Sequence, residues 1–180
     1  DFDGDGRVDI LRQGQNDSIQ FCRNLGGGDF PSCTTVATYS GCGLRELVVE
    51  DFNCDGIDDV FLPFSSTSSS CFKRVLIGRG DGVFLEAPQG TLPALLERTM
   101  GVAAADVDND NDIDLLLAND DNVQNRLYLN NCSNLQDQGV CTQGVPHFDN
   151  ADFGGVAYAF SRSPTGSPQG GHLTTATWDQ

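Results

Sequence analysis

The stretch DVDNDNDIDL, residues 106–115, alternates acidic residues with other residues and runs into an apolar segment. Two further stretches repeat its pattern: DFDGDGRVDI at residues 1–10 and DFNCDGIDDV at residues 51–60. All three fit D-x-[DN]-x-D-[GN]-x-x-D-apolar, and they start 50 residues (51 minus 1) and 55 residues (106 minus 51) apart. Periods of this length are typical of propeller blades and solenoid coils. The sequence therefore predicts a repeat protein.

Short apolar runs follow each acidic stretch, and similar runs precede the second and the third. They show no helical period, so they predict β-strands. Farther along each repeat, two more strands flank a turn: residues 18–30 align with 73–84, both rich in glycine, and a third copy starts at 125–131 and reaches Phe148 after an insertion. The predicted fold is all-β, with propeller-type blades of four antiparallel strands and an acidic hairpin loop in each.

The repeats divide the chain into blade-like units at about residues 1–40, 41–95 and 96–150. Residues 151–180 are expected to form a connector and the first strand of a further blade. We treat residues 1–180 as one repeat domain. Three or so blades do not close a ring that usually needs about four to eight. We therefore expect a fragment of a propeller or an open blade array, as part of a longer chain or of an assembly of several copies.

The acidic stretches hold 13 of the 26 Asp and Glu residues, in a chain whose formal net charge is −16. Clustered carboxylates repel one another unless a cation lies between them. In a tight loop, the side chains at positions 1, 3, 5 and 9 and the carbonyl at position 7 can form a cage made only of oxygen. Hard oxygen ligands with several carboxylates favour calcium, and position 6 must turn sharply, as Gly6, Gly56 and Asn111 allow.

About three calcium sites are predicted. Their side-chain ligands are Asp1, Asp3, Asp5 and Asp9; Asp51, Asn53, Asp55 and Asp59; and Asp106, Asp108, Asp110 and Asp114, while Arg7, Ile57 and Asp112 would supply the carbonyls. An EF-hand does not fit, because that motif needs Glu at position 12, where this chain has Arg12, Leu62 and Leu117. A structural role of the ion, bracing a hairpin, is favoured over a sensor or catalytic role.

Composition excludes several classes. Only 10 Lys and Arg residues are present, which argues against nucleic-acid binding. The apolar runs are much shorter than the roughly 20 residues of a membrane helix. Hydrophobic residues make up 38% of the chain, enough for a folded core.

Seven cysteines and the sequons at Asn16 and Asn131 favour an oxidising, extracellular compartment, with both asparagines as candidate glycosylation sites. Connectivity does not follow from sequence alone. Hairpin symmetry favours Cys22 with Cys33 and Cys132 with Cys141. Cys42 is paired with Cys71 because they precede the first and third strands of the second repeat, at the same end of the blade. Cys54 then stays free or forms an intermolecular bond.

The acidic loops, their flanking strands and the Gly-Asp-Gly-Val-Phe turn at residues 80–84 resemble the FG-GAP or VCBS repeat, the calcium-binding blade of integrin alpha-type propellers. The third copy is especially similar to repeats of cartilage-acidic-protein-like secreted proteins. This resemblance covers most of residues 1–150 and implies an extracellular propeller used for adhesion or as a scaffold, usually without catalysis.

The sequence thus predicts a secreted or cell-surface, calcium-stabilised module that binds a protein or glycan partner or has a structural role. No enzymatic activity is expected, because His147 and His172 lie in no recognisable triad. One alternative is a subunit of a polymeric surface fibre that self-associates. Another is the propeller portion of a secreted hydrolase or polysaccharide lyase.

Overall fold

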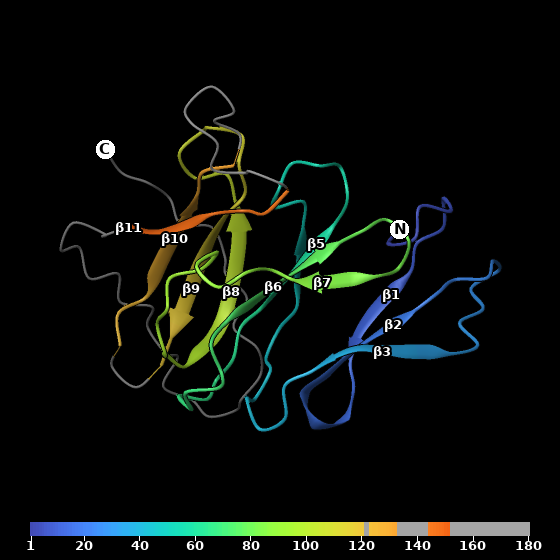
Figure 1. The fold of residues 1–180 in the computed structure, drawn as a ribbon, viewed down its shortest axis with the longest axis horizontal. Coiled ribbons are helices and arrows are strands. Elements are labelled where there is room, and N and C mark those ends of the chain that lie inside the picture. Colours follow the sequence, from blue (N-terminus) through green and yellow to red (C-terminus); the bar gives the residue numbers. More distant parts are fainter. Residues whose placement is uncertain (121–122, 133–143, 152–180) are drawn as a thin grey trace, which may run out of the picture.

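A computed structural model describes residues 1–120, 123–132 and 144–151 of the chain. They form three antiparallel sheets that follow one another across the molecule (Figure 1). The first sheet has the strand order β1-β2-β3, the second β4-β5-β6-β7 and the third β11-β10-β9-β8. The strands are β1 Ile10–Gln13, β2 Ser18–Cys22, β3 Cys33–Thr38, β4 Val48–Glu50, β5 Asp59–Leu62, β6 Arg74–Gly78, β7 Phe84–Glu86, β8 Thr99–Ala105, β9 Asp114–Asn119, β10 Arg126–Asn130 and β11 Phe148–Ala151.

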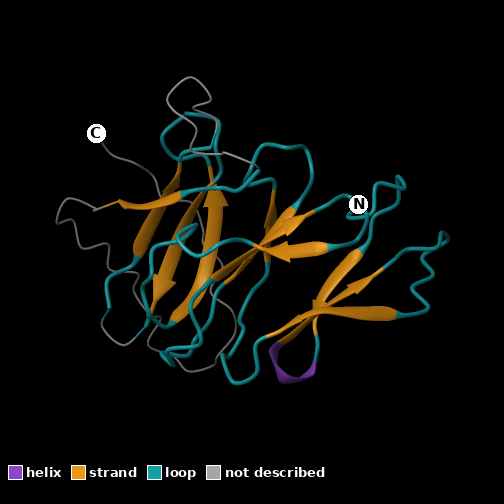
Figure 2. Ribbon diagram, in the orientation of Figure 1, coloured by secondary structure: helices purple, strands orange, loops and turns teal. Residues whose placement is uncertain are grey.

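The all-β prediction is confirmed. A single turn of 3-10 helix, η1 (Gln15–Asp17), is the one helical element in the described part of the chain (Figure 2). The second and third sheets have four strands each, as predicted, and each places its acidic loop between its first and second strands. The first sheet has three strands, and its acidic loop at residues 1–9 leads directly into β1. The three loops lie at the same end of the sheets, the upper end in Figure 1.

Two apolar cores hold the sheets face to face. Between the first and second sheets, Ile19 of β2 packs with Val60 and Leu62 of β5 and Leu76 of β6. Between the second and third sheets, the opposite face of the second sheet supplies a different set. This second core consists of Phe52, Phe61, Val75, Ile77, Val102, Leu115, Leu117, Tyr128 and Phe148. Because strand residues alternate in direction, Val60 and Phe61 face different cores, and the middle sheet is buried on both faces.

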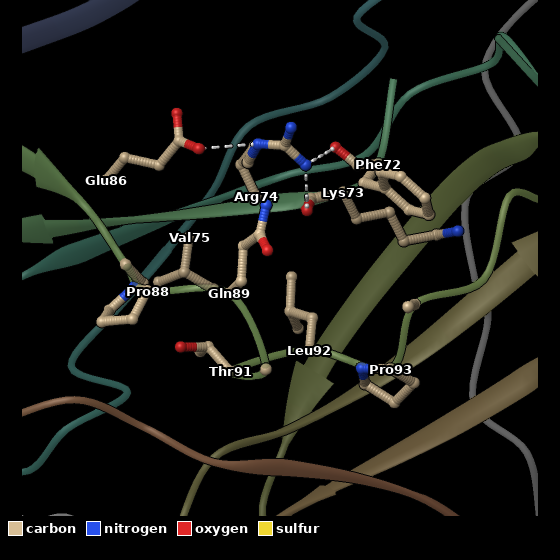
Figure 3. A pocket seen from close by; sticks show the side chains of 13 residues that line it. Phe72, Lys73, Arg74, Val75, Glu86, Pro88, Gln89, Thr91, Leu92 and Pro93 are labelled. Carbon is tan, nitrogen blue, oxygen red and sulfur yellow. Dashed lines mark hydrogen bonds and ion pairs between the residues drawn. The ribbon is translucent and has the colours of Figure 1, made fainter. Parts of the chain in front are cut away.

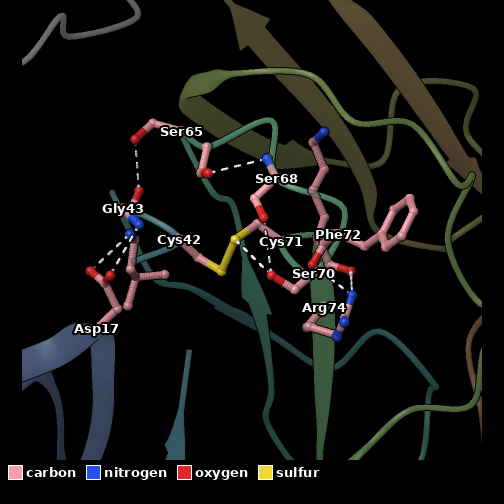
Figure 4. Close-up of a disulfide and its surroundings, with 12 residues drawn as sticks. Asp17, Cys42, Gly43, Ser65, Ser68, Ser70, Cys71, Phe72 and Arg74 are labelled. Carbon is pink, nitrogen blue, oxygen red and sulfur yellow. Dashed lines mark hydrogen bonds between the residues drawn. A yellow bond between two sulfur atoms is a disulfide. The ribbon is translucent and has the colours of Figure 1, made fainter. Parts of the chain in front are cut away.

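Two disulfides lie within the first two repeats, and both join cysteines that were predicted to pair. Cys22–Cys33 links β2 to β3, where the two residues are direct partners in the ladder. Cys42–Cys71 ties the connector after β3 to the segment before β6, and both residues belong to the first core (Figure 4). Nearby, the Asp17 carboxylate accepts hydrogen bonds from the backbone N–H groups of Gly43 and Leu44, at 3.0 and 3.1 Å.

The remaining cysteines have different environments. Cys54 is free and exposed. Cys132 is buried and disulfide-bonded, and Cys141, its predicted partner, lies outside the described residues. The predicted boundaries of the repeats stay predictions, and the connector and further strand assigned to residues 151–180 fall almost wholly outside the described part. Within that part, none of the helices has the length and apolar character needed to cross a membrane.

Candidate metal centres

The three acidic loops share one hydrogen-bond framework. In each, the carboxylate at position 1 accepts the backbone N–H groups of positions 5 and 6. In the first loop these are Asp5 N–H and Gly6 N–H, at 3.1 and 2.7 Å from the two oxygens of Asp1. The corresponding distances are 3.1 and 2.8 Å in the second loop and 3.2 and 3.1 Å in the third. The repeated sequence pattern therefore corresponds to a repeated loop structure.

The carboxylate at position 5 completes the turn by accepting the backbone N–H of position 7. The distances are 2.9 Å for Asp5, 2.8 Å for Asp55 and 2.9 Å for Asp110. Position 6 has positive φ in every loop, which agrees with the sharp turn expected there. Position 4 has it too, at Gly4, Cys54 and Asn109, with φ of 72°, 58° and 63°. The sequence pattern left position 4 unconstrained, so this second left-handed residue was not anticipated.

The carboxylate at position 9 joins the loop to its own sheet. Asp9 accepts the N–H groups of Phe2 and Asn24, both at 2.9 Å. Asp59 does the same with Phe52 and Gly78, at 3.2 and 2.9 Å, and Asp114 with Val107 and Asn130, both at 2.8 Å. One oxygen thus holds position 2 of the loop, and the other holds a residue just after β2 in the first sheet or the last residue of β6 or β10 in the other two. All three carboxylates are buried, so each braces the hairpin whether or not it also binds an ion.

Carboxylate oxygens converge in two of the loops. The side chains of Asp1, Asp3 and Asp9 place one oxygen each within 4.8 Å of the others, and Asp106, Asp108 and Asp114 do the same. The second loop has Asn53 in place of the acid at position 3. Three carboxylates at this separation repel one another unless a cation joins them, and a donor set made only of oxygen suits a hard cation. These clusters could hold a metal ion.

Two of the position 9 carboxylates, Asp59 and Asp114, have a raised pKa. The pKa of Asp59 is raised to about 7, mainly by burial; the charges of Asp55 and Asp51 also raise it, and the backbone hydrogen bonds from Gly78 and Phe52 lower it. Burial also raises the pKa of Asp114, with Asp108 and Asp110 adding to the effect. A cation among these groups would favour their charged forms.

Arginine side chains neutralise part of the first loop. Arg23 Nε lies 2.6 Å from Asp3 Oδ2, and Arg7 forms an ion pair with Asp5 while its Nε donates to the Asn24 carbonyl at 2.7 Å. Ile57 and Asp112, the other two residues predicted to supply a carbonyl ligand, have surroundings that differ from those of Arg7. Ile57 lies against Gly78 and Gly80, and the buried Asp112 side chain has its Oδ1 3.5 Å from Cys54 Sγ.

Position 2 contributes contacts that the sequence pattern did not include. The Phe2 carbonyl accepts the N–H of Gly82 from the second sheet at 2.8 Å, and the Phe2 ring lies 5.4 Å from that of Phe84. The Phe52 ring lies in the same way near Phe148 of the third sheet, at 5.7 Å. The residue pair Asp-Phe occurs at the start of two of the three repeats, and this recurrence is the signal that could have revealed the contact.

A pocket of about 330 Å³ lies away from the acidic loops, between β6 and the segment that follows β7 (Figure 3). Its walls are mainly apolar, from Val75, Leu92 and neighbouring prolines. Arg74 at its edge pairs with Glu86 at 2.8 Å and donates to the Phe72 carbonyl at 2.7 Å. The charged groups at this edge are therefore engaged with one another or with the backbone.

The two candidate glycosylation sites differ in their surroundings. Asn16 is exposed in η1. The Asn131 side-chain amide donates to Asp149 Oδ2 at 3.0 Å, and Ser133 of its sequon lies outside the described residues.

Comparison with known families gives one match. The model of the FG-GAP-like repeat matches residues 1–62 and 65–117, together 115 of the 180 residues (62 plus 53). Searches of the curated proteins and of the solved structures returned no match.

Proposed function

The chain belongs to the FG-GAP-like repeat family, and we propose that it is an extracellular module stabilised by calcium, with a binding, adhesion or scaffold role and no catalytic activity. The observation that carries this proposal is the framework repeated in the three acidic loops, with carboxylate oxygens converging in the first and third. Such a framework holds the carboxylates of each loop in place to bind one ion tightly.

Calcium suits these loops better than magnesium. Each loop offers four side chains with oxygen ligands and a backbone carbonyl at position 7, and calcium accepts six to eight such ligands in flexible geometry. Magnesium demands a stricter octahedron and keeps its water more firmly. When bound, calcium would offset the repulsion among the carboxylates. The chain's own residues would hold the loop in shape through the hydrogen bonds of Asp1, Asp51 and Asp106 to the backbone.

An extracellular location is supported by the two disulfides, since such bonds persist in oxidising compartments. A non-catalytic role is supported by the state of the acidic residues. The carboxylates that could serve as a general acid or base in the loops are engaged in backbone hydrogen bonds that define the hairpins. A module of this kind is suited to adhesion or scaffolding through a protein or glycan partner. Binding to an array of candidate glycans and cell-surface proteins, probed with and without calcium, tests the proposed partner.

The calcium proposal is tested by calorimetric titration with calcium and magnesium, together with thermal unfolding in calcium and in a chelator. We expect about three calcium ions per chain and a higher melting temperature, because an ion at 100 times its Kd adds about 2.7 kcal/mol of stability per site. Asp55→Asn should remove about one site. Glu46→Gln, the same loss of charge at an exposed position outside the loops, should remove none. Equal behaviour of the chain in calcium and in chelator would contradict the proposal.

Self-association is a second candidate, and one observation favours it. Ile10 stands at the position of Val60 and Leu115, which are fully buried between sheets, yet it is 41% exposed. Val8 and Leu25, in the loops next to the strands of the same sheet, are also exposed. A further blade or a second copy of the chain would cover this face. Sedimentation velocity over a range of concentrations tests the idea: Ile10→Asp should abolish association, and a monomer at every concentration would contradict it.

A further inference from the structure

Asn130, the last residue of β10, contacts two acidic loops at once. Its backbone N–H donates to Asp114 Oδ1, the closing carboxylate of the third loop, at 2.8 Å. Its side-chain Nδ2 donates to the Phe52 carbonyl in the second loop at 2.7 Å. The residue is fully buried, so neither bond competes with water. A single residue of the third sheet thus lies between two predicted ion sites.

Phe52 is held from both sides as a result. Its N–H donates to Asp59 Oδ2 at 3.2 Å, and its carbonyl accepts Asn130 Nδ2. Phe52 also follows directly after Asp51, the first predicted ligand of its loop. A change in the position of the Phe52–Asn53 peptide, whose carbonyl accepts Asn130 Nδ2, is therefore transmitted to Asn130 and, through the Asn130 N–H, to Asp114. The two loops are therefore connected by two hydrogen bonds, one from the side chain and one from the backbone of Asn130.

A second contact joins the same two loops. Cys54, at position 4 of the second loop, places Sγ 3.5 Å from Oδ1 of Asp112, at position 7 of the third. In addition, Asn53 Nδ2 donates to the Gly144 carbonyl, in the segment before β11, at 2.8 Å. The second loop is therefore braced against the third repeat at positions 2, 3 and 4.

The first and second loops are joined differently. Gly78 donates its N–H to Asp59, and it is the separate residue Gly82 that reaches the Phe2 carbonyl. Asn24, which occupies the place of Asn130 in the first repeat, turns its side-chain amide to the Val8 carbonyl of its own loop at 2.9 Å. No single side chain among the described residues links the first loop to the second as Asn130 links the second to the third.

We propose that Asn130 is a positioning residue that couples the second and third calcium sites, so that an ion in either loop strengthens binding in the other. The inference rests on the calcium sites of the proposed function. An ion orders the carboxylates and the peptide at the start of its loop. Because the two loops share Asn130, an ion in one loop partly orders the backbone of the other. The ion that binds later, in the other loop, therefore has a lower entropic cost of binding. The reciprocal effect has the same size by thermodynamic linkage.

The coupling is measured without changing Asn130. Calcium titrations of the full chain are followed through the amide resonances of Gly6, Gly56 and Asn111, one for each loop, with a competing chelator where binding is tight. Asp55→Asn disables the second loop, and Asp5→Asn is the matched change in the first. We expect Asp55→Asn to weaken the third site about five-fold or more, the lower end of common coupling strengths, and Asp5→Asn to change it less than about two-fold.

Asn130→Ala then tests the route, since it removes the side-chain donor but keeps the N–H that binds Asp114. In this background the third site should respond no more to Asp55→Asn than to Asp5→Asn. Asn24→Ala is the control, and it should leave the coupling intact. A third site that responds equally to the two loop variants in the unmodified background would overturn the coupling while leaving calcium binding in place. A chain that binds no calcium would overturn the proposed function together with the coupling.

Discussion

The ring of Phe52, in the second acidic loop, meets the ring of Phe148, at the start of β11, edge to face with centroids 5.7 Å apart. Both side chains are buried in the core between the second and third sheets. The backbone of Phe148 is held in turn, because its N–H donates to the Thr91 carbonyl at 2.9 Å. An aromatic residue of an acidic loop therefore also holds two repeats together.

Phe52→Ala should lower the free energy of unfolding by roughly 3–5 kcal/mol, as expected for a fully buried Phe whose removal leaves a cavity. Phe52→Leu should cost less, because most of the volume is kept. Urea unfolding monitored by circular dichroism measures both. Val83→Ala, at an exposed apolar position, is the control and should change stability by less than about 0.5 kcal/mol. An Ala variant as stable as the Val83 control would show that this packing does not stabilise the fold.

Cys54→Gly should stabilise the chain by roughly 0.5–1 kcal/mol in the absence of calcium. Cys54 has φ of 58°, a left-handed conformation that glycine adopts without steric cost and other residues do not. Cys54→Val should be destabilising, because a β-branched residue is least compatible with this conformation. Thermal unfolding in chelator ranks the three proteins. A parent chain more stable than Cys54→Gly would mean that the thiol contact with Asp112 outweighs the backbone strain.

Removal of Cys42–Cys71 should cost more stability than removal of Cys22–Cys33. The sequence separations are 29 and 11 residues, which correspond to roughly 4 and 3 kcal/mol in the chain-entropy description. Cys42 and Cys71 also pack in the first core, so their loss disturbs the contact between two sheets. Paired Cys→Ala variants, compared by urea unfolding under identical conditions, give the two values. Equal or reversed costs would contradict the prediction.

Stability should rise with pH between about 8 and 10.5 because of Lys73. The pKa of this amine is lowered to about 8, mainly by burial, while Glu97 raises it and Arg126 lowers it. In that range the unfolded chain binds more protons at this residue than the folded chain, so the free energy of unfolding increases as pH rises. The rise from this group is at most roughly 3 kcal/mol.

Lys73→Met should remove that rise and be at least as stable as the parent at pH 7, where the buried ammonium is unfavourable. Urea unfolding at pH 7, 8, 9 and 10 is the measurement, and both proteins carry Cys54→Gly to prevent thiol exchange in alkali. Arg12→Met, at an exposed position, is the control and should leave the pH profile unchanged. Parallel profiles for the Lys73 variant and its parent would rule out the assignment.

Much of the loop structure was predictable because its interactions are local. The hydrogen bonds from positions 5, 6 and 7 connect residues at most five apart, so a pattern of nine residues contains them. The position 6 turn followed from glycine and asparagine for the same reason. The left-handed conformation at position 4 was not predicted. Gly4, Cys54 and Asn109 have unlike side chains, so the sequence pattern accepts any residue there, although all three have positive φ.

The position 9 carboxylates form hydrogen bonds that the sequence pattern did not reveal. Their spacing marked them as ligands, but their hydrogen bonds to Asn24, Gly78 and Asn130 reach 15, 19 and 16 residues along the chain. These partners are set by how β2 pairs with β1, β6 with β5 and β10 with β9. A prediction of strands without their register does not provide them.

From its sequence alone, this protein was determined to be an all-β chain of repeated blades with acidic loops, because strand alternation and tight turns depend on neighbouring residues. Only the tertiary structure decided which side chains join one repeat to the next. Asn130 and Phe52 are 78 residues apart, and their contact exists because two sheets pack face to face and bury both residues. Burial leaves a polar group no partner but the one that packing brings to it, and that partner does not follow from local sequence.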